Sequence, residues 1–241
     1  MNTLLVDVGN SKTLVARLTL VPGGSIGPLE RIWTGETSSA DAAGIAARIA
    51  ALRGDGDVVG LVSVVPALTD ALRTALPDIR CVDHRVDFPF QVAIDSPETV
   101  GADRWCNVAA AVDAGCDHAI VVDAGTATTI DVLEGGVFVG GFIAPGMAFA
   151  ARKLQEEAAR LWTVPFEPVP LAPGRDTDAA LAAGAFHVGV CGIAGVVDAL
   201  LEDRPDARVV LTGGLGKFLV RPDWHYDADW TLRGLAVLLQ R

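Results

Sequence analysis

The sequence predicts an α/β protein made of two copies of one structural unit. A short apolar run, an aspartate and a glycine turn occur twice, about half the chain apart. Runs of strand length alternate along the chain with longer stretches that carry helix-capping residues. The 241 residues are 51% hydrophobic and 20% charged, a globular composition that excludes a largely disordered chain. This length allows one large domain or two small ones.

The repeated segments are expected to form two β-hairpins. The first copy covers residues 4–13 and the second covers residues 120–129. Each begins with β-branched or aliphatic residues, which are typical of a buried strand, and has its aspartate near the strand end. Each runs into a second apolar stretch, residues 14–20 and 130–133, which favours a hairpin over a helix. We therefore expect a duplicated unit with a boundary near Gly115.

Helices and further strands are predicted around the hairpins. Ser39 or Asp41 is expected to cap a helix that ends at Arg53, before the turn of residues 54–56. Further helices are predicted over residues 66–76, 103–112, 147–161 and 177–201, strands over residues 58–64 and 209–211, and turn-rich connections over residues 22–28 and 165–174.

The two aspartate–glycine turns have the composition of a phosphate-binding site. Glycine allows backbone N–H groups to approach phosphate oxygens, and hydroxyl side chains add further donors. Asp7 and Asp123 stand where a carboxylate can hold a metal ion or its water shell. A single turn of this kind is common, but two at matched offsets predict a nucleotide cleft between the two halves of the chain.

A third glycine turn follows the strand expected at residues 209–211. Residues 212–217 read Thr-Gly-Gly-Leu-Gly-Lys, but Leu211 and Phe218 stand where a Walker loop needs a glycine and a hydroxyl side chain. An ordinary turn or a helix C-cap is the structural alternative to an adenosine-binding turn. Because the two aspartate–glycine hairpins occur in the same chain, we favour the adenosine-binding interpretation.

Charge and targeting signals limit the classes of partner. The chain has 19 Lys and Arg against 30 Asp and Glu, and its net charge of −11 argues against a general nucleic-acid binder or a polybasic membrane-surface protein. The N-terminus has no basic segment before Asp7, so no signal peptide is expected. Residues 179–197 are uncharged and long enough for a bilayer, but their Ala/Gly-rich composition and acidic flanks favour a tightly packed buried helix, with a subunit interface as one setting. We expect a cytoplasmic protein with no membrane or nucleic-acid partner.

The cysteines and histidines show no metal-binding or catalytic pattern. Cys81, Cys106, Cys116 and Cys191 form no Cys-x-x-Cys pair. The last three have apolar neighbours in the sequence and are expected to be buried, reduced thiols. The four histidines have no ligand or triad spacing, and the tryptophans and phenylalanines are expected in the core or in a contact between subunits.

Six blocks of sequence, in this order along the chain, resemble a known family. The most specific are residues 97–104, which include Gly-Ala-Asp-Arg, and residues 140–146, which read Gly-Gly-Phe-Ile-Ala-Pro-Gly. The others are residues 7–13, 123–129, 174–177 with Gly184, and 212–214. Together they resemble the type III pantothenate kinases of the acetate kinase–sugar kinase–Hsp70–actin superfamily.

This resemblance implies a fold and a reaction. The fold is a duplicated ribonuclease-H-like (actin-like ATPase) α/β fold, in which two half-domains enclose a central nucleotide cleft. Residues 1–115 would hold the phosphate-1 turn and the acceptor block, and residues 116–241 would hold the phosphate-2 and adenosine motifs and the dimer helices. The reaction is ATP-dependent phosphorylation of the 4′-hydroxyl of pantothenate, the first step of coenzyme A biosynthesis. Family members are homodimers that use Mg2+ and a monovalent cation, potassium or ammonium.

The resemblance also implies roles for individual residues. Asp103 would be the catalytic proton acceptor, and Asp123 would hold the monovalent cation. The residues implied for ATP are Asp7, Val8, Gly9, Asn10, Ser11, Lys12, Thr13, Leu14, Thr126, Gly213 and Gly214, with Asp7 also contacting Mg–ATP. The residues implied for pantothenate are Gly101, Ala102, Asp103, Arg104 and Thr177, together with the position of Ile94.

Each of these roles has a structural alternative. Asp103 stands at a predicted helix start, where an N-cap aspartate would have a lowered pKa and would be a weak base. The loose transition state of phosphoryl transfer would still let it orient the acceptor hydroxyl. Arg104 is either a surface charge or a bidentate partner for a carboxylate or phosphate. Lys12 is a contributor in the first turn rather than a certain catalyst, and Asp7 and Asp123 are alternatively caps of their turns.

The chain differs from the family pattern at one position, and two alternative functions remain open from the sequence. Many family members have a tyrosine that touches pantothenate where this chain has Ile94. This difference keeps open a related kinase that acts on another small alcohol. The other rival is a non-catalytic regulatory protein of the same family, and the retention of Asp7, Asp103 and Asp123 together argues for the kinase.

Overall fold

Two β-sheets organise the chain, which divides into two compact units. The computed structural model describes residues 2–19, 26–158, 161 and 164–241. Unit 1 comprises residues 1–116, 136–139 and 229–241, and unit 2 comprises residues 117–135 and 140–228. The first break therefore lies beside Gly115, while the C-terminal residues pack with the N-terminal part of the chain.

The sheet of unit 1 has the strand order β3-β2-β1-β4-β5. Its strands are β1 (Asn2–Val8), β2 (Lys12–Thr19), β3 (Leu29–Glu36), β4 (Val58–Ser63) and β5 (Arg80–Cys81). β1 and β2 form the antiparallel hairpin that the sequence predicts, and β4 runs parallel to β1. β3, which the sequence analysis does not predict, pairs with β2 and extends the hairpin to a three-stranded meander.

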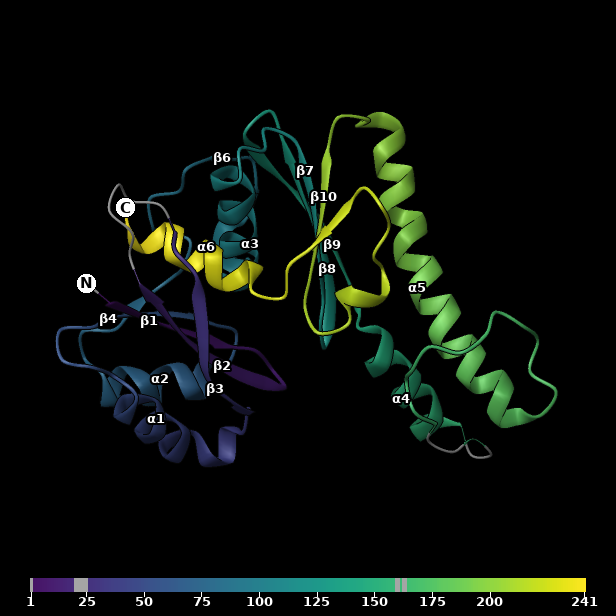
Figure 1. Cartoon of the computed structure of the whole chain (residues 1–241), viewed down its shortest axis with the longest axis horizontal. Helices are drawn as coiled ribbons and strands as arrows, with labels where there is room; N and C mark the ends of the chain where they lie inside the picture. The colour runs from purple at the N-terminus through teal and green to yellow at the C-terminus, as the bar shows by residue number, and fades with distance from the viewer. Residues whose placement is uncertain (1, 20–25, 159–160, 162–163) are drawn as a thin grey trace. The chain divides into compact units, whose positions relative to one another are not determined.

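Helices cover both faces of this sheet (Figure 1). The 3-10 turn η1 (Ser39–Asp41), α1 (Ala42–Ala51) and α2 (Pro66–Ala75) follow the predicted helices. Their apolar residues form one core with the side chains of Leu4, Val6 and Val8 on alternate positions of β1. The opposite face carries α3 (Ala102–Asp113), which is introduced by η2 (Pro97–Thr99), and α6 (Trp230–Leu239).

Helix α6 belongs to unit 1 because it packs directly on the backbone of α3. A Cβ atom at Gly234 would overlap the carbonyl group of Cys106, so glycine is required at this crossing. The indole Nε1 of Trp230 donates to the carbonyl oxygen of Asn107 over 3.0 Å. The hydroxyl of Thr231 donates to Asn107 Oδ1 over 2.9 Å. Buried hydrogen bonds of this kind fix the register of the two helices.

Unit 2 repeats the hairpin in a second sheet. The strand order of this sheet is β11-β10-β7-β8-β9-β6, with β11 (Trp224–Tyr226), β10 (Arg208–Thr212), β7 (Ala119–Ala124), β8 (Ala127–Glu134), β9 (Val137–Pro145) and β6 (Gln91–Val92). β7 and β8 form the predicted antiparallel hairpin, and β10 lies parallel to β7. The first residues of β9 belong to unit 1, where Val137 and Phe138 pair with β6 (Gln91–Val92).

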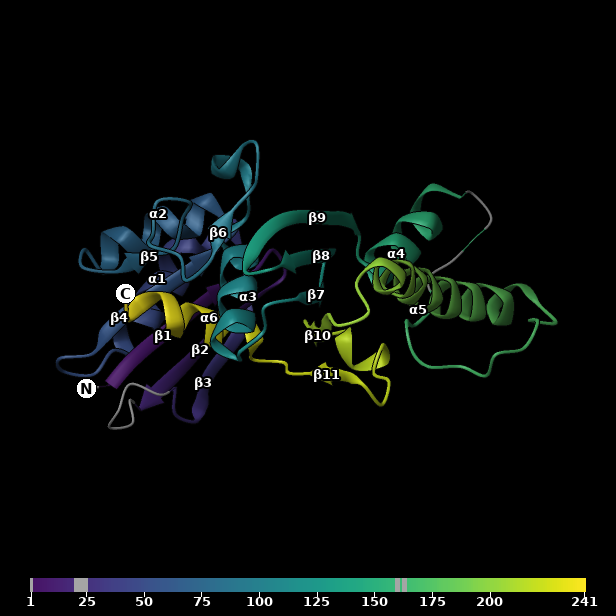
Figure 2. The ribbon, with the colours of Figure 1, turned by 90° about the horizontal axis from the view of Figure 1, so that it is seen from above.

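Helices α4 (Met147–Glu157) and α5 (Thr177–Asp203) lie side by side in both views (Figures 1 and 2). They pack with β7 and β10 in one core, which includes Met147, Ile193 and Val197. α4 ends four residues earlier than predicted, and residues 159–160 of the predicted extension lie outside the described residues. The connection before α5 has no regular element over residues 164–176, as its turn-rich sequence predicts.

Helix α5 is not buried within this chain, so of the settings that the sequence analysis names, only the subunit interface is compatible with its exposure. Only 17% of its most apolar 18-residue window is buried, and Val188 is 74% exposed. By length and composition this helix could cross a membrane, a weak criterion that core helices of soluble proteins also satisfy. Only one face of the helix packs on the sheet, through residues such as Ile193 and Val197. Most of its other apolar side chains therefore lie at the surface of this chain.

The exposure of α5 also corrects the cysteine prediction. Cys106 and Cys116 are buried, as predicted, but Cys191 lies on α5 and is exposed. All four cysteines are free thiols, so the structure contains no disulfide among them.

Candidate active site

The first predicted phosphate turn connects β1 to β2. Its backbone closes through a bond from the Gly9 amide to the Lys12 carbonyl oxygen over 3.0 Å. The neighbouring strand holds it, since the Thr37 amide donates to the Ser11 carbonyl oxygen over 3.1 Å. Asn10, Ser11 and Lys12 are exposed at the tip. The turn therefore presents backbone and short polar side chains on a rigid base, which is the form of a phosphate-binding loop.

Asp7 and Asp103 lie in the same region of unit 1. Alternation along β1 points Asp7 away from the core that holds Val6 and Val8, toward the face covered by α3. Both carboxylates lie near the thiol of Cys106 on α3. The pKa of this thiol is raised first by burial and then by the charges of Asp7 and Asp103. The fold thus brings the first phosphate turn and the acceptor block together, as the sequence analysis requires.

Asp103 does not cap its helix, and the predicted lowering of its pKa is wrong. Gly101 occupies the N-cap position of α3, and Asp103 is the second residue of the helix. Partial burial raises the pKa of Asp103, and this effect exceeds the opposing effects of the Arg104 amide and the Arg104 charge. The Arg104 amide donates to Asp103 Oδ1 over 2.9 Å. A carboxyl group with a raised pKa is a stronger base than the N-cap interpretation allows.

Gly101 is required by this arrangement. A Cβ atom at position 101 would lie 2.5 Å from Asp103 Oδ1. Any larger residue would have to displace the carboxylate. The glycine of the Gly-Ala-Asp-Arg block therefore gives the Asp103 side chain the space in which it lies.

Arg104 packs on an aromatic cluster that the sequence motifs do not reveal. Its guanidinium carbon lies 5.6 Å from the centre of the Phe138 ring. Phe138 also receives the backbone of the segment that carries Ile94, because the Ala93 amide donates to its carbonyl oxygen over 3.0 Å. Nothing in the spacing of Phe138 marks it out, since it precedes the specific block at residues 140–146.

The second predicted phosphate turn connects β7 to β8 in unit 2. The Gly125 amide donates to the Ala127 carbonyl oxygen over 3.0 Å, whereas the Gly9 amide of the first turn donates one residue further along the chain, to Lys12. Asp123 is paired in register with Thr129 of β8 and with Thr212 of β10. Thr126 is exposed at the tip of the turn. The second turn is therefore one residue shorter than the first, since Val8 pairs with Thr13 but Ala124 pairs with Thr128.

The glycine turn after β10 is held against this second turn. Gly213 has a φ of +76°, and a Cβ atom there would lie 2.5 Å from Asp123 Oδ1 and 2.6 Å from the Ala124 carbonyl oxygen. The Leu215 amide donates to the same Ala124 oxygen over 3.0 Å. Only glycine combines this backbone conformation with so close an approach. The turn leads into η3 (Gly216–Phe218), and Gly214 has open space around it.

The specific block at residues 140–146 also ends against the second turn. The Gly146 amide donates to the Thr126 carbonyl oxygen over 3.1 Å, and a side chain at position 146 would overlap the backbone of Gly125 and Thr126. This block therefore supports the shape of the predicted phosphate-2 turn.

Thr177 is the first residue of α5 and is exposed. Asp176 caps the helix, since its side chain accepts the Ala179 amide over 2.8 Å. The predicted site residues divide between the two units. Unit 1 contains Asp7 to Leu14, Ile94 and Gly101 to Arg104. Unit 2 contains Asp123, Thr126, Thr177, Gly213 and Gly214.

No cluster of three or more His, Cys, Asp or Glu side chains suited to a metal ion occurs among the described residues. Near Asp123, however, a carboxylate oxygen and the Ala124 carbonyl oxygen both lie beside Gly213. A carboxylate combined with backbone carbonyl oxygens is the donor set that hard cations prefer. The residues around Asp123 therefore fit the predicted monovalent cation in the type of their donors.

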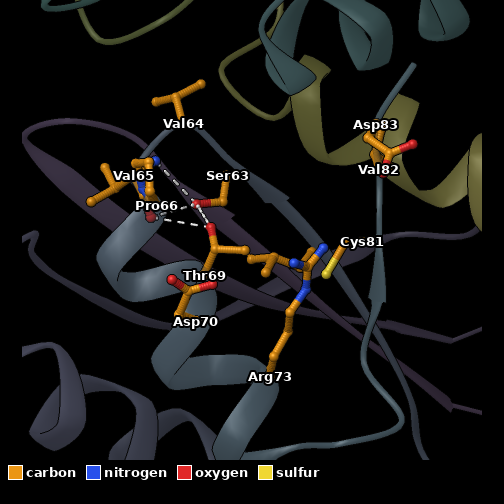
Figure 3. Close-up of a pocket in the computed structure, with 11 residues that line it drawn as sticks. Ser63, Val64, Val65, Pro66, Thr69, Asp70, Arg73, Cys81, Val82 and Asp83 are labelled. Atoms are coloured by element: carbon orange, nitrogen blue, oxygen red, sulfur yellow. Dashed lines mark hydrogen bonds between the residues drawn. The ribbon is translucent and has the colours of Figure 1, made fainter. Parts of the chain in front are cut away.

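A separate cavity of about 350 Å³ lies between α2 and the ends of β4 and β5 (Figure 3). Arg73 extends across it toward Cys81, and Thr69 donates to Ser63 Oγ over 2.8 Å in its wall. Its described lining contains none of the residues predicted for ATP or pantothenate. Two of its lining residues adjoin the predicted site: Ser63 pairs with Val8 in register, and the Val64 amide donates to the Val8 carbonyl oxygen over 3.0 Å.

Known proteins resemble this chain over most of its length. The family model described as type III pantothenate kinase matches residues 3–201. The type III pantothenate kinase of Thermomicrobium roseum is 37% identical over 202 residues, which cover 77% of this chain and 76% of that protein. The type III pantothenate kinase of Salinispora arenicola is 34% identical over 252 residues, which cover 99% of this chain and 98% of that protein.

Solved structures share the fold at low sequence identity. A Campylobacter jejuni chain classed with Baf family transcriptional activators has a TM-score of 0.59 at 21% identity, covering 98% of this chain and 97% of that chain. A ROK family glucokinase from Streptomyces griseus has a TM-score of 0.53 at 13% identity, covering 100% of both chains. These likenesses confirm the predicted duplicated ribonuclease-H-like fold. The family-model match over residues 3–201 and the relatives of 37% and 34% identity establish that this chain belongs to the type III pantothenate kinase family.

Proposed function

We propose that this protein phosphorylates pantothenate with ATP to give 4′-phosphopantothenate, the first step of coenzyme A biosynthesis. Membership of the family supports this reaction. The observation that carries it is the Asp103 carboxyl group, which has a raised pKa and lies in the same region of unit 1 as Asp7. A base at this position and a phosphate turn beside it are the two parts that transfer to an alcohol requires.

Asp103 acts on the acceptor. Its carboxylate accepts the proton of the 4′-hydroxyl and orients the oxygen in line with the transferred phosphoryl group. The transition state of this transfer is loose, so proton removal is late and orientation is the larger contribution. Arg104 pairs with the carboxylate of pantothenate, for which the planar guanidinium is well suited.

The glycine turns bind ATP. In unit 1 the turn from Asp7 to Leu14 contacts the phosphates, with Lys12 adding the cation at its exposed tip. In unit 2 Thr126 contacts the phosphates, and Gly213 and Gly214 contact the adenosine. Mg2+ bound with ATP neutralises phosphate charge, and Asp7 is the carboxylate of unit 1 assigned to it. Backbone N–H groups and cations replace the basic side chains that a chain of net charge −11 lacks.

Asp123 is assigned to a monovalent cation, potassium or ammonium. Its carboxylate and the Ala124 carbonyl oxygen supply the oxygen donors. The cation would add positive charge at the second phosphate turn.

We further infer a cytoplasmic homodimer in which α5 forms the contact between subunits. Val188 and Val196 are exposed on this helix, and Ile143 and Leu154 are exposed on the neighbouring elements of unit 2. Apolar surface of this extent on a monomer marks an interaction site. Without Lys or Arg at either end of residues 179–197, a second copy of the helix is a better partner than a bilayer.

The first prediction tests the reaction itself with an acceptor panel. ATP consumption coupled to product detection should require pantothenate and should be negligible with other small alcohols.

In the same assay, Asp103→Asn should lower kcat by ~100-fold or more, because it removes the base. It should not lower the melting temperature, because it removes a partly buried charge. Asp113→Asn, at the exposed end of the same helix, is the matched control and should behave as the wild type. Near-wild-type turnover of Asp103→Asn, or a preference for another alcohol, would contradict the proposal.

The second prediction concerns pH. The base is active only when ionised, so kcat/KM should fall as the pH drops through the raised pKa of Asp103. This acid limb should lie above the ordinary aspartate value of 3.8. The free energy of unfolding should change with pH in the opposite direction to kcat/KM. Between the unfolded and the folded pKa, rising pH should lower the free energy of unfolding, and Asp103→Asn should remove that slope. An acid limb at the ordinary aspartate value would overturn the assignment.

The third prediction concerns the cation at Asp123. Turnover should be high in potassium or ammonium chloride and low in sodium chloride at equal ionic strength. Asp123→Ala should abolish this dependence together with most of the turnover. Asp117→Ala, an exposed carboxylate in the same unit, should retain both. Equal wild-type activity in sodium and potassium would refute the cation site.

The fourth prediction concerns assembly. The wild-type protein should sediment as a dimer, and Val188→Asp should shift it to the monomer, because the charge would have to be buried in the contact. Val220→Asp introduces the same charge at an exposed valine outside α5 and should leave the dimer intact. A wild-type monomer at micromolar concentration would disprove the assigned contact.

A further inference from the structure

Phe138 is fully buried, and the proposed mechanism does not use it. It lies near the start of β9, in the part of this strand that belongs to unit 1. Its ring meets the Trp105 ring edge to face, with centroids 5.4 Å apart and an interplanar angle of 83°. It meets the Phe90 ring in the same way at 6.3 Å and 90°. These two edge-to-face contacts hold the orientation of the Phe138 ring.

The oriented ring carries the guanidinium of Arg104. The Arg104 Cζ atom lies 5.6 Å from the ring centre, within the range of a cation–π interaction. Arg104 directly follows Asp103, and Trp105, which braces the ring, directly follows Arg104. One turn of α3 therefore bears the proposed base, the proposed carboxylate partner and part of the support for that partner.

The backbone of Phe138 holds a second part of the acceptor region. Val92 of β6 pairs with Phe138, and the Ala93 amide donates to the Phe138 carbonyl oxygen over 3.0 Å. Ile94, a position that the resemblance implies for pantothenate, follows immediately. Phe138 is thus joined to the Ile94 segment through its main chain and to Arg104 through its side chain.

We propose that Phe138 is a positioning residue, whose ring holds the Arg104 guanidinium in the orientation that pairs with the carboxylate of the acceptor. This inference rests on the proposed function of Arg104. An arginine side chain has many rotamers, and holding it on a ring reduces the entropy lost when substrate binds. A planar guanidinium can pair with a carboxylate through two parallel N–H donors, so its orientation matters for that pairing.

The kinetic test compares two substitutions within one aromatic cluster. Phe138→Leu removes the ring under Arg104, and Phe90→Leu removes a ring of the same cluster that contacts Phe138 but is not stacked on Arg104. Both should lower the melting temperature to a similar degree. Phe138→Leu should raise the KM for pantothenate by ~3- to 20-fold, the range expected for a lost cation–π contact, with kcat and the KM for ATP near the wild type. Phe90→Leu should leave all three constants near the wild type. Equal pantothenate KM values for the two variants would overturn the proposal.

A double-mutant cycle with Arg104→Gln isolates the coupling. Once the guanidinium is absent, Phe138→Leu should add less than ~2-fold to the KM for pantothenate, because the two changes remove one interaction. A full additional effect in the Arg104→Gln background would show that the ring acts through the fold alone and would refute the positioning role.

A labelling experiment separates failure of this inference from failure of the proposed function. Phenylglyoxal modification of Arg104, followed by peptide mass spectrometry, reads the packing of the guanidinium without any catalysis. Labelling should be ~3-fold faster or more in Phe138→Leu than in Phe90→Leu, because the side chain is released from the ring. Equal labelling rates would overturn the inference whatever the kinase assay shows. Faster labelling in a protein that does not phosphorylate pantothenate would refute the proposed function while upholding the packing.

Discussion

The close approach of helices α3 and α6 is the constraint on which unit 1 depends. Gly234 leaves no space for a side chain above the Cys106 carbonyl group, and Asn107 is bonded to both Trp230 and Thr231. These contacts bring the C-terminal helix onto the N-terminal part of the chain. They also fix the axis of α3, and therefore the direction in which its first turn presents Asp103. A substitution that separated the two helices would move the proposed base without touching it.

Space, rather than charge, shapes the polar turns. Gly101 admits the Asp103 carboxylate, Gly213 admits the oxygens of Asp123 and Ala124, and Gly146 packs on the second phosphate turn. Each glycine lets backbone or carboxylate oxygens come close, so the turns are formed by the main chain. This explains how a chain of net charge −11 with few lysines can bind an anionic nucleotide under the proposed function. The negative charge of the whole protein then excludes only partners that need a broad basic surface.

Burial explains where interpretation of the sequence failed. A helix-start aspartate is expected to have a lowered pKa, but Asp103 lies two residues past the N-cap, and its burial raises its pKa. Residues 179–197 have the composition of a buried helix, yet α5 meets its sheet along one edge and leaves Val188 and Cys191 outside. In each case the local sequence pattern predicts the helix correctly but does not predict how far its side chains are buried within the chain. Solvent exposure depends on what packs against a residue, and that is a property of distant segments.

The sequence by itself determined the two hairpins, most of the helices and the blocks that mark the family, because periodicity, capping residues and glycine turns are local signals. Only the tertiary structure decided that α6 completes unit 1, that Asp103 and Asp7 share one region, and that Arg104 lies on Phe138. These facts depend on contacts between residues far apart in the chain. Phe138 shows the difference most clearly, since an ordinary phenylalanine at the start of a strand carries no signal until the ring beneath the arginine is seen.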